Sequence, residues 1–401
     1  MSNFNYRTII ILSVLLFHWT SLASDPVNLY IIKDQNYLGD YNQLLGIAKK
    51  TKEYFAQHKI PLNTTEYNVA DLKSFSTEIQ NTKNPIIISA GLYGIEAIKL
   101  LKSENKTSNN ILAIHVSHQI LNNNKLSHIQ LVRTEEKSSG ADIIVLPTHI
   151  LETTDRKQLE SKYTKLVRVI GVAHNLELHE IEKEYAKFEH ILPKADRYIG
   201  VILAGDAPDS NGKMHYYTES DAQKLAEYVS NLAIKQNYTV LVTNSPRTGK
   251  HNQRTNKEQP EVHQNGVMDP VTAKFQEVLI KNKVNFKLFD FQKNKPSFYK
   301  AMVGAILHHP SNMIFIPGES TSMISECLDI LPGSNVVIYY NSAMNKNHER
   351  HVKSEYDNGR ASVLQNMQLI KQKNDSIQKN SSANQVIAEA IYNLYLSDNM
   401  K

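Results

Sequence analysis

The sequence predicts an α/β protein that contains two doubly wound parallel sheets, one after the other along the chain. Three observations support this fold class. The 401 residues exceed the length at which one hydrophobic core usually keeps growing. Short apolar runs of strand length alternate with helical periodicity, and they lack the strict polar alternation of half-exposed strands. This alternation occurs in two series, with a charged amphipathic segment between them.

The first series is the less regular one. Its strand-like runs are rich in isoleucine, leucine and valine, which favour strands that are buried on both faces. The predicted strands are residues 27–32, 86–89, 111–116, 142–146 and 166–171, and the predicted helices are residues 42–57 and 94–102.

The second series has clearer helix signals. Asp269 is a good N-cap, and Pro270 suits the first helical position. Because crossovers between parallel strands are right-handed, this series favours a doubly wound sheet. The predicted strands are residues 198–203, 238–243, 286–291, 312–316 and 335–340, and the predicted helices are residues 220–236, 271–282 and 297–307.

The segment between the two series sets the domain boundary. Residues 176–188 are charged and amphipathic, so we place the boundary near residue 190. This predicts an N-terminal domain over residues 24–190 and a C-terminal domain over residues 191–345. The chain is polar after Tyr340, so we expect residues 346–401 to form a polar linker and a final helix at 384–396.

Residues 1–23 have the pattern of a signal peptide. Arg7 is followed by an apolar run over residues 8–17, and small residues fit a cleavage site after Ala23. An uncleaved anchor and a buried strand are the alternatives, although the apolar run is short for a spanning helix. We therefore expect an exported protein, periplasmic or secreted, with no membrane segment once the leader is removed.

Charge and cysteine content argue against two other classes of function. The formal net charge of +5 is small for this length and the lysines are scattered, so we predict no nucleic-acid partner. The single cysteine, Cys327, cannot form an internal disulfide. Its apolar helical neighbours predict a core position and not a nucleophile.

The segment IFIPGESTSMISE, residues 314–326, changes abruptly from a buried strand to a row of hydroxyls. In a parallel sheet, such a strand end lies where ligands bind, next to the free N–H groups of a helix start. Ser320, Thr321 and Ser322 would therefore suit a phosphate, and Glu326 could reach a ribose. Plain helix capping is the alternative for the hydroxyls, and a solvated surface acid is the alternative for Glu326.

Two further strand ends support a ligand site at this edge. Gly205, after the strand at 198–203, would let backbone approach a ligand closely. Arg247, after the strand at 238–243, would bring a guanidinium whose fork matches a diphosphate. A surface arginine in a polar loop is the alternative for Arg247.

Several of these motifs resemble a known family. The segments NSPRTG (244–249), GESTSMISE (318–326), ILAG (202–205) and LPTH (146–149) are similar to the mitochondrial-fission "elongated mitochondria" family of plants and its bacterial relatives. The chain departs from the family pattern at two places, Pro246 in place of a first arginine and Glu319 in place of an aspartate.

The resemblance implies a GT-B glycosyltransferase-like architecture, with two facing Rossmann-like domains and the final helix packed on the N-terminal one. It further implies a nucleotide sugar in the C-terminal domain. Arg247 and Thr248 would meet its diphosphate, residues 320–322 its phosphates, and Glu326 its ribose.

Histidines supply the candidate catalytic groups. His118 and His149 follow strands of the N-terminal domain and face the expected cleft, so either could be the general base on an acceptor hydroxyl. Other histidine pairs lack the spacing of a zinc motif, and the 204–211 loop has no DxD, so we predict no metal and no cofactor.

The sequence therefore predicts a metal-independent glycosyltransferase with a nucleotide-sugar donor and an acceptor of unknown class. Two alternatives remain open at this stage. The first is a periplasmic two-lobe ligand-binding protein, and the second is a non-catalytic interaction protein with a protein partner on the same scaffold.

Overall fold

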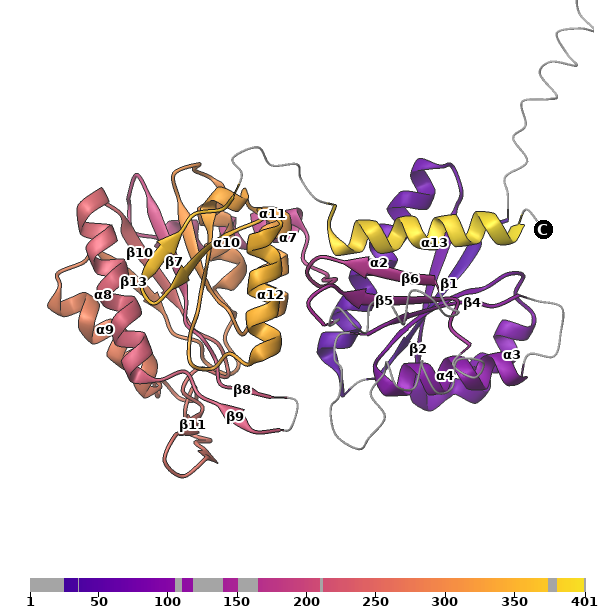
Figure 1. Cartoon of the computed structure of the whole chain (residues 1–401), viewed down its shortest axis with the longest axis horizontal. Helices are drawn as coiled ribbons and strands as arrows, with labels where there is room; N and C mark the ends of the chain where they lie inside the picture. The colour runs from indigo at the N-terminus through magenta and orange to yellow at the C-terminus, as the bar shows by residue number, and fades with distance from the viewer. Residues whose placement is uncertain are drawn as a thin grey trace, which may run out of the picture.

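The computed structural model describes residues 25–34, 36–104, 110–117, 140–150, 165–209, 212–373 and 381–399. Figure 1 shows two lobes, each with a central sheet and helices on both faces. The expected signal peptide at residues 1–23 and the candidate base His118 lie outside the described residues.

The first sheet is parallel, with the strand order β2-β1-β3-β4-β5-β6. Its central strands β3 to β5 are buried along their whole length. The described strands are β1 (Val27–Lys33), β2 (Leu62–Asn68), β3 (Ile86–Ala90), β4 (Leu112–Val116), β5 (Ile143–Pro147) and β6 (Lys165–Val169), with helices α2 (Leu38–Gln57), α3 (Leu72–Gln80) and α4 (Gly91–Glu104) and the 3₁₀ turn η1 (Val69–Asp71).

The second sheet has the strand order β13-β10-β7-β14-β15-β16-β17 and is parallel except for its last pair. Its strands are β7 (Tyr198–Ile202), β10 (Thr239–Thr243), β13 (Phe286–Phe289), β14 (Met313–Pro317), β15 (Val336–Tyr339), β16 (Ser362–Gln365) and β17 (Gln368–Ile370). Its helices are α7 (Leu178–Phe188), α8 (Glu219–Gln236), α9 (Pro270–Lys281), α10 (Tyr299–Leu307), α11 (Thr321–Ile330) and α12 (Lys346–Asp357), with 3₁₀ turns η2 (Glu189–Ile191) and η3 (Gly333–Asn335).

Two short hairpins extend from the loops of the second lobe. They are β8 (Ala207–Pro208) with β9 (Met214–His215), and β11 (His251–Asn252) with β12 (Lys257–Glu258). The first of them lies beside the region where the two lobes meet (Figure 1).

Both faces of each sheet are covered, which explains the continuous apolar runs of the sequence. Side chains of α2 and the C-terminal helix α13 (Ala383–Asn399) pack on one face of the first sheet, and those of α3 and α4 pack on the other. In the second sheet, α8 and α9 cover one face, and α7, α10 and α11 cover the other. The predicted α/β class with two Rossmann-like sheets is thereby confirmed.

Local sequence signals fix several helix starts. The side chain of Asp269 accepts a hydrogen bond from the Thr272 N–H at 2.8 Å, and Pro270 follows at the first helical position, as predicted for α9. Thr218 caps α8 in the same way through the Asp221 N–H, at 3.1 Å.

The chain crosses from the first lobe to the second through residues 170–177. Helix α7 already belongs to the second lobe, because it packs against α10 and its Ile181 is fully buried there. The domain boundary therefore lies at residues 170–177, earlier in the chain than the predicted position near residue 190. The reason is that α7 is part of the second lobe, where its apolar face packs against the sheet.

The chain returns to the first lobe at its C-terminal end. Helix α13 packs along α2, with Ile387 and Ile391 buried in the first core, as expected for the final helix (Figure 1). The segment before it differs from the predicted polar linker over residues 346–401. Residues 346–370 form α12, β16 and β17, which extend the second sheet.

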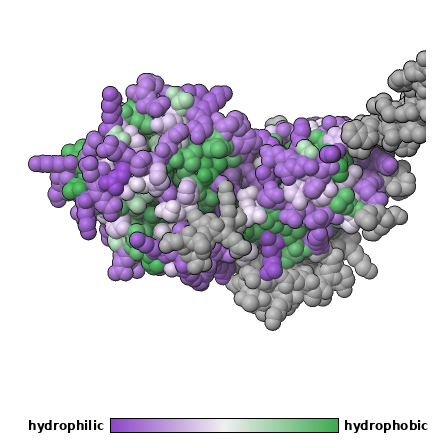
Figure 2. All heavy atoms as spheres, turned by 90° about the horizontal axis from the view of Figure 1, so that it is seen from above, coloured by the Kyte–Doolittle hydropathy of each residue, from purple (hydrophilic) through white to green (hydrophobic). Residues whose placement is uncertain are grey.

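The surface carries no broad apolar face in the view of Figure 2. Hydrophilic residues cover most of both lobes there, and hydrophobic residues form separate patches. Among the helices that the structure describes, none is both long and apolar enough to cross a bilayer.

Candidate functional site

A cleft of about 670 Å³ is lined by residues of both lobes. In the second sheet the strand order reverses between β7 and β14, and in the first sheet it reverses between β1 and β3. Such reversals open a crevice at the carboxyl ends of parallel strands, where α/β sheets usually bind ligands. The cleft takes residues from the loops and helices that follow β1, β7 and β14, so it lies where the topology predicts a site.

The start of α11 forms one wall of the cleft. Ser320 is its N-cap residue, yet the Ser320 side chain makes no capping hydrogen bond. Capping therefore does not account for this hydroxyl. Ser320, Thr321 and Ser322 all line the cleft, next to the free N–H groups and positive dipole end of the first helical turn. This wall is suited to an anion.

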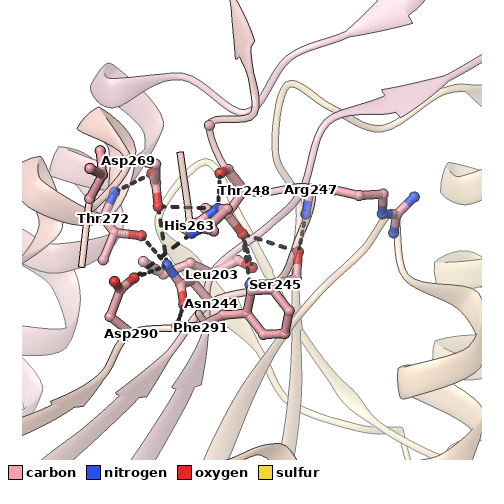
Figure 3. A network of polar contacts seen from close by, with 12 residues as sticks. Leu203, Asn244, Ser245, Arg247, Thr248, His263, Asp269, Thr272, Asp290 and Phe291 are labelled. Atoms are coloured by element: carbon pink, nitrogen blue, oxygen red, sulfur yellow. Dashed lines mark hydrogen bonds and ion pairs between the residues drawn. The ribbon is translucent and has the colours of Figure 1, made fainter. Parts of the chain in front are cut away.

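Arg247 lines the same cleft from the loop after β10. Its side chain is exposed, and its guanidinium has no hydrogen bond or ion pair with any residue in the described ranges. Figure 3 shows the guanidinium extending away from the polar network below the loop. The structure thus brings the Arg247 side chain and the hydroxyls of residues 320–322 together in one pocket.

Glu319 connects the start of α11 to the loops after β7 and β15. Its carboxylate accepts hydrogen bonds from the Gly205 N–H at 2.8 Å and from the Asn341 amide at 2.9 Å. These partners follow β7 and β15, so one side chain joins the ends of three neighbouring strands. Burial raises the pKa of Glu319, while the two donors and nearby Arg247 act in the opposite direction.

Gly205 has a structural role in place of the predicted ligand contact. Its N–H is occupied by Glu319, and it is not among the residues that line the cleft. A Cβ at this position would lie 2.8 Å from the Arg247 Cβ and 3.0 Å from the Ser245 Oγ. The missing side chain therefore allows two loops to pack together, and the backbone does not approach a ligand there.

Thr248 also lies away from the cleft. It is fully buried, and its hydroxyl accepts the Ser245 N–H at 3.0 Å and lies 3.4 Å from the Leu203 carbonyl oxygen. This hydroxyl closes the turn that presents Arg247. The structure does not place Thr248 where the predicted diphosphate contact needs it, because its side chain is enclosed by its own turn and does not line the cleft.

Glu326 points to a neighbouring helix. Tyr299 of α10 donates a hydrogen bond to its carboxylate at 2.7 Å, and Glu326 is not among the residues that line the cleft. Burial is the main cause that raises the pKa of Glu326. The predicted ribose contact therefore does not match the position of this side chain, which faces the core side of α11.

The first lobe supplies the opposite wall. His149, in the turn after β5, is buried and lines the cleft, as predicted. Asp40, in the first turn of α2, also lines it and is almost fully buried. Sequence reasoning missed Asp40, although its position shortly after β1, at the reversal of the first sheet, was an available signal. The cleft thus holds two groups that can accept a proton on the side opposite Arg247.

His348 is a second cleft residue that the sequence did not mark as functional. It lies in the first turn of α12 and lines the cleft with Asn345 and Asn347. Its Nδ1 accepts the Asn345 N–H at 3.2 Å in a capping box. Burial, followed by the effects of His351, Arg247 and His215, lowers the pKa of His348 from 6.5 to about 4.

A polar cluster beneath the Arg247 loop fixes its base (Figure 3). The Asn244 amide nitrogen lies 3.1 Å from Asp269 Oδ2, 2.9 Å from Thr272 Oγ1 and 2.7 Å from Asp290 Oδ1. His263 Nε2 donates to the Thr248 carbonyl at 2.8 Å. The cluster thereby connects the loop after β10 to α9 and to the end of β13.

The same cluster contains a group of potential metal ligands, namely His263, Asp269 and Asp290. A cation that bridges the two carboxylates would need the space between them. The Asn244 amide donates to both carboxylates and takes that position. We therefore interpret the cluster as a scaffold for the Arg247 loop.

A chain of buried ion pairs joins residues of the two lobes. Arg360 pairs with Asp329 at 2.6 Å and with Glu355 at 3.1 Å, and Asp329 also contacts the first-lobe His174 at 3.0 Å. Arg360 is only 9% exposed at its side chain, and Glu355 is fully buried. These contacts hold the crossing segment against α11 and α12.

Two histidines connect these ion pairs to the cleft. His351 Nε2 lies 3.1 Å from Glu355 Oε1, with both side chains fully buried. The His351 ring is 4.6 Å, centroid to centroid, from the ring of His149. The candidate base His149 is thus packed against a side chain of the opposite lobe, so its position depends on how the lobes are docked.

The sequence and the structure were compared with known proteins. The model of the family described as mitochondrial fission ELM1 matches residues 39–271, more than half of the chain. None of the curated proteins compared with the sequence matches it.

The structure was also compared with solved structures. The UDP-GlcNAc 2-epimerase of Methanocaldococcus jannaschii is 13% identical, with 93% of this chain and 99% of that chain covered and a TM-score of 0.50. The UDP-GlcNAc 2-epimerase of Neisseria meningitidis bound to UDP-GlcNAc is 11% identical, with 93% and 92% covered and a TM-score of 0.38. Sucrose-phosphate synthase of Thermosynechococcus elongatus is 9% identical, with 92% and 95% covered and a TM-score of 0.41.

At 13% identity, the likeness to the Methanocaldococcus jannaschii epimerase concerns the fold only, and nothing is argued from the other two structures, whose TM-scores are below 0.5. The family match is independent of them, because it covers the chain from α2 to the start of α9 by sequence. The chain therefore belongs to the mitochondrial fission ELM1 family, and it has a GT-B-like fold with two Rossmann-like domains.

Proposed function

We propose that this protein is an exported, metal-independent glycosyltransferase that binds the diphosphate of a nucleotide sugar in the second lobe. The observation that carries this proposal is the shared pocket of Arg247 and the hydroxyls of residues 320–322. Arg247 has no partner among the described residues, and the hydroxyl of Ser320 is not used for capping. Both are therefore free to bind phosphate oxygens.

The chemistry needs a group that stabilises the leaving diphosphate. In the proposed transfer, an acceptor oxygen forms a bond to the anomeric carbon while the bond from this carbon to the diphosphate oxygen breaks. The electron pair stays on the diphosphate, where Arg247 and the dipole of α11 face the developing charge. These groups supply positive charge from the protein itself.

The proton of the acceptor hydroxyl passes to a base of the first lobe. His149 and Asp40 line the cleft on that side, and both are mostly withdrawn from water. The Asp40 carboxylate and the His149 imidazole are both able to accept a proton from a bound hydroxyl. We assign the base to His149 or Asp40, and the separate variants His149→Phe and Asp40→Asn distinguish them by which one abolishes turnover.

Export is part of the proposal and rests on residues 1–23 alone. The mass of the mature protein from its native cell tests it. A chain that begins at Ser24 and lies outside the cytoplasm supports export, and a full-length chain in the cytoplasm contradicts it.

Ligand binding tests the function itself. UDP, GDP and their sugar derivatives are added to the purified full chain, and its melting temperature is measured. A ligand that binds only the folded state raises the melting temperature. A rise with at least one nucleotide that is lost in Arg247→Ala supports the proposal, and no rise with any of them contradicts it.

A further inference from the structure

His348 lines the cleft, and one of its two ring nitrogens is used at the start of α12. Its Nδ1 accepts the Asn345 N–H at 3.2 Å, and the reciprocal bonds of the capping box run from the Asn347 and His348 N–H groups to the Asn345 side chain, at 3.0 and 3.1 Å. A neutral imidazole that accepts at Nδ1 carries its proton at Nε2. The capping box thus fixes the tautomer.

The second ring nitrogen, Nε2, belongs to a side chain that lines the cleft. Nε2 lies across the ring from Nδ1, and it makes no hydrogen bond with the described part of the chain. His348 and Arg247 line the same cleft, and the nearby positive charge of Arg247 is one cause that keeps the pKa of His348 low. The site therefore contains one charged donor and one neutral donor.

We propose that His348 is a positioning residue of the diphosphate site, where its neutral Nε2–H donates a hydrogen bond to a phosphate oxygen held by Arg247. This inference rests on the proposed function and adds to it a second anchor on a different helix. Arg247 comes from the loop after β10 and His348 from α12. Two donors on separate elements would fix the direction of a diphosphate as well as its presence.

The geometry also limits what His348 can do. Because its Nδ1 lone pair is used in the capping box, the neutral ring has no accessible acceptor for a proton from an acceptor hydroxyl. A neutral donor next to a guanidinium avoids the repulsion of two cations before the ligand binds. We therefore assign ligand positioning to His348 and leave the role of general base to the first lobe.

Two substitutions separate the donor from the capping function. Glutamine and glutamate are both favoured at the third position of a capping box, so His348→Gln and His348→Glu should preserve the start of α12. His348→Gln keeps an N–H donor, whereas His348→Glu places a carboxylate where the donor was. Unliganded melting temperatures close to that of the unchanged protein show that the fold is kept.

Calorimetric titration with UDP and with inorganic pyrophosphate provides the test. We expect His348→Gln to bind within about threefold of the unchanged protein, and His348→Glu to bind at least about 10-fold more weakly, as expected for a lost hydrogen bond to a charged group. Exposed Lys346→Gln, in the same helical turn, is the matched control and should bind normally.

The outcomes distinguish this inference from the proposed function. If the unchanged protein binds and Arg247→Ala does not, but His348→Glu binds normally, the role of His348 is overturned and the proposed function stands. Equal losses in His348→Gln and His348→Glu would also overturn it, because they indicate a structural effect. Failure of the unchanged protein to bind either probe overturns both.

Discussion

The Glu319 carboxylate accepts the Gly205 N–H at 2.8 Å, across the point where the strand order of the second sheet reverses. A reversal leaves two loops that diverge from neighbouring strands, and a buried N–H in such a loop needs an acceptor. Glu319 supplies it, and it also accepts from Asn341 at 2.9 Å. The start of α11 and the loop after β7 are therefore held together before any ligand binds.

Removal of this acceptor should weaken the fold at the cleft. Glu319→Ala leaves the buried Gly205 N–H and the partly buried Asn341 amide without their acceptor, and we expect a loss of about 2–4 kcal/mol in the free energy of unfolding. Glu319→Gln can still accept from Gly205 and should lose less. Urea unfolding of both variants measures the difference, and equal stability of Glu319→Ala and the unchanged protein would contradict the clamp.

The pH dependence of stability tests whether the Glu326 side chain is buried against Tyr299 and not in the cleft. Burial raises the pKa of Glu326 above 4.5 in the folded state, so the folded state binds a proton more readily than the unfolded state. The stability that depends on this group therefore falls as pH rises through the raised pKa. In Glu326→Gln this dependence should disappear, with a gain in stability at pH 7 relative to the unchanged protein.

The pH profile of the unfolding free energy, from urea unfolding between pH 4 and 8, provides the measurement for Glu326. Glu349→Gln is the matched control, because Glu349 is exposed on α12, and it should leave the profile unchanged. Weaker nucleotide binding by Glu326→Gln at unchanged stability would support the ribose contact that the sequence predicted and contradict the buried position of Glu326.

Arg360 is expected to be the most costly ion-pair residue to replace. Arg360→Met leaves the carboxylates of Asp329 and Glu355 buried without their cation, and loss of one partner of a buried pair costs about 3–5 kcal/mol. Lys353→Met removes an exposed ion pair with Asp357, in which the Lys353 side chain is 70% exposed. This substitution should cost less than about 1 kcal/mol of the free energy of unfolding. Thermal unfolding of the two variants gives the comparison, and similar losses would contradict the buried chain.

His348 should add an acid sensitivity to the fold. Its pKa is lowered from 6.5 to about 4, so between these values the unfolded state binds more protons than the folded state. Stability should therefore fall as pH drops from 6.5 towards 4. Because the ring is partly exposed to solvent, we expect the contribution to be about 2 kcal/mol or less.

The unfolding free energy of His348→Gln, measured over the same pH range, isolates this contribution. Its decline below pH 6.5 should be shallower than that of the unchanged protein, and nitrogen-15 spectra should show a neutral ring protonated at Nε2 at pH 6. A ring that titrates near pH 6.5 in the folded protein would contradict the environment described for it.

The sequence was informative where strands are buried on both faces. β10, with its uninterrupted run TVLVT, and β14 appear within one or two residues of the predicted ranges. The edge strand β2, LNTTEYN, was missed because it is mostly exposed and carries polar side chains. Its assignment depends on pairing with β1 and not on its own composition.

Helix α12 was missed for a different reason. Its buried side chains are His351, Val352 and Glu355, so its inward face has no apolar stripe. Burial of Glu355 depends on Arg360 and on His351, which only the folded structure brings together. The sequence reads as polar there, although the segment completes the second sheet.

Only some of the residues that the sequence marked as ligand-binding line the cleft. Arg247 and the hydroxyls of residues 320–322 share the pocket that strand topology indicates. Thr248 closes the turn below, and Glu326 turns towards Tyr299, because each finds a partner inside the protein. Helical spacing alone could not distinguish the cleft face of α11 from the face that packs on α10.

The most direct test of the central claim is a titration of the full chain with UDP, alongside Arg247→Ala and the exposed control Arg254→Ala. The account predicts saturable binding by the unchanged protein and by Arg254→Ala, and binding by Arg247→Ala that is about 10- to 100-fold weaker, as expected for loss of charge-assisted hydrogen bonds. Equal binding by all three proteins would contradict a diphosphate site at Arg247 and residues 320–322.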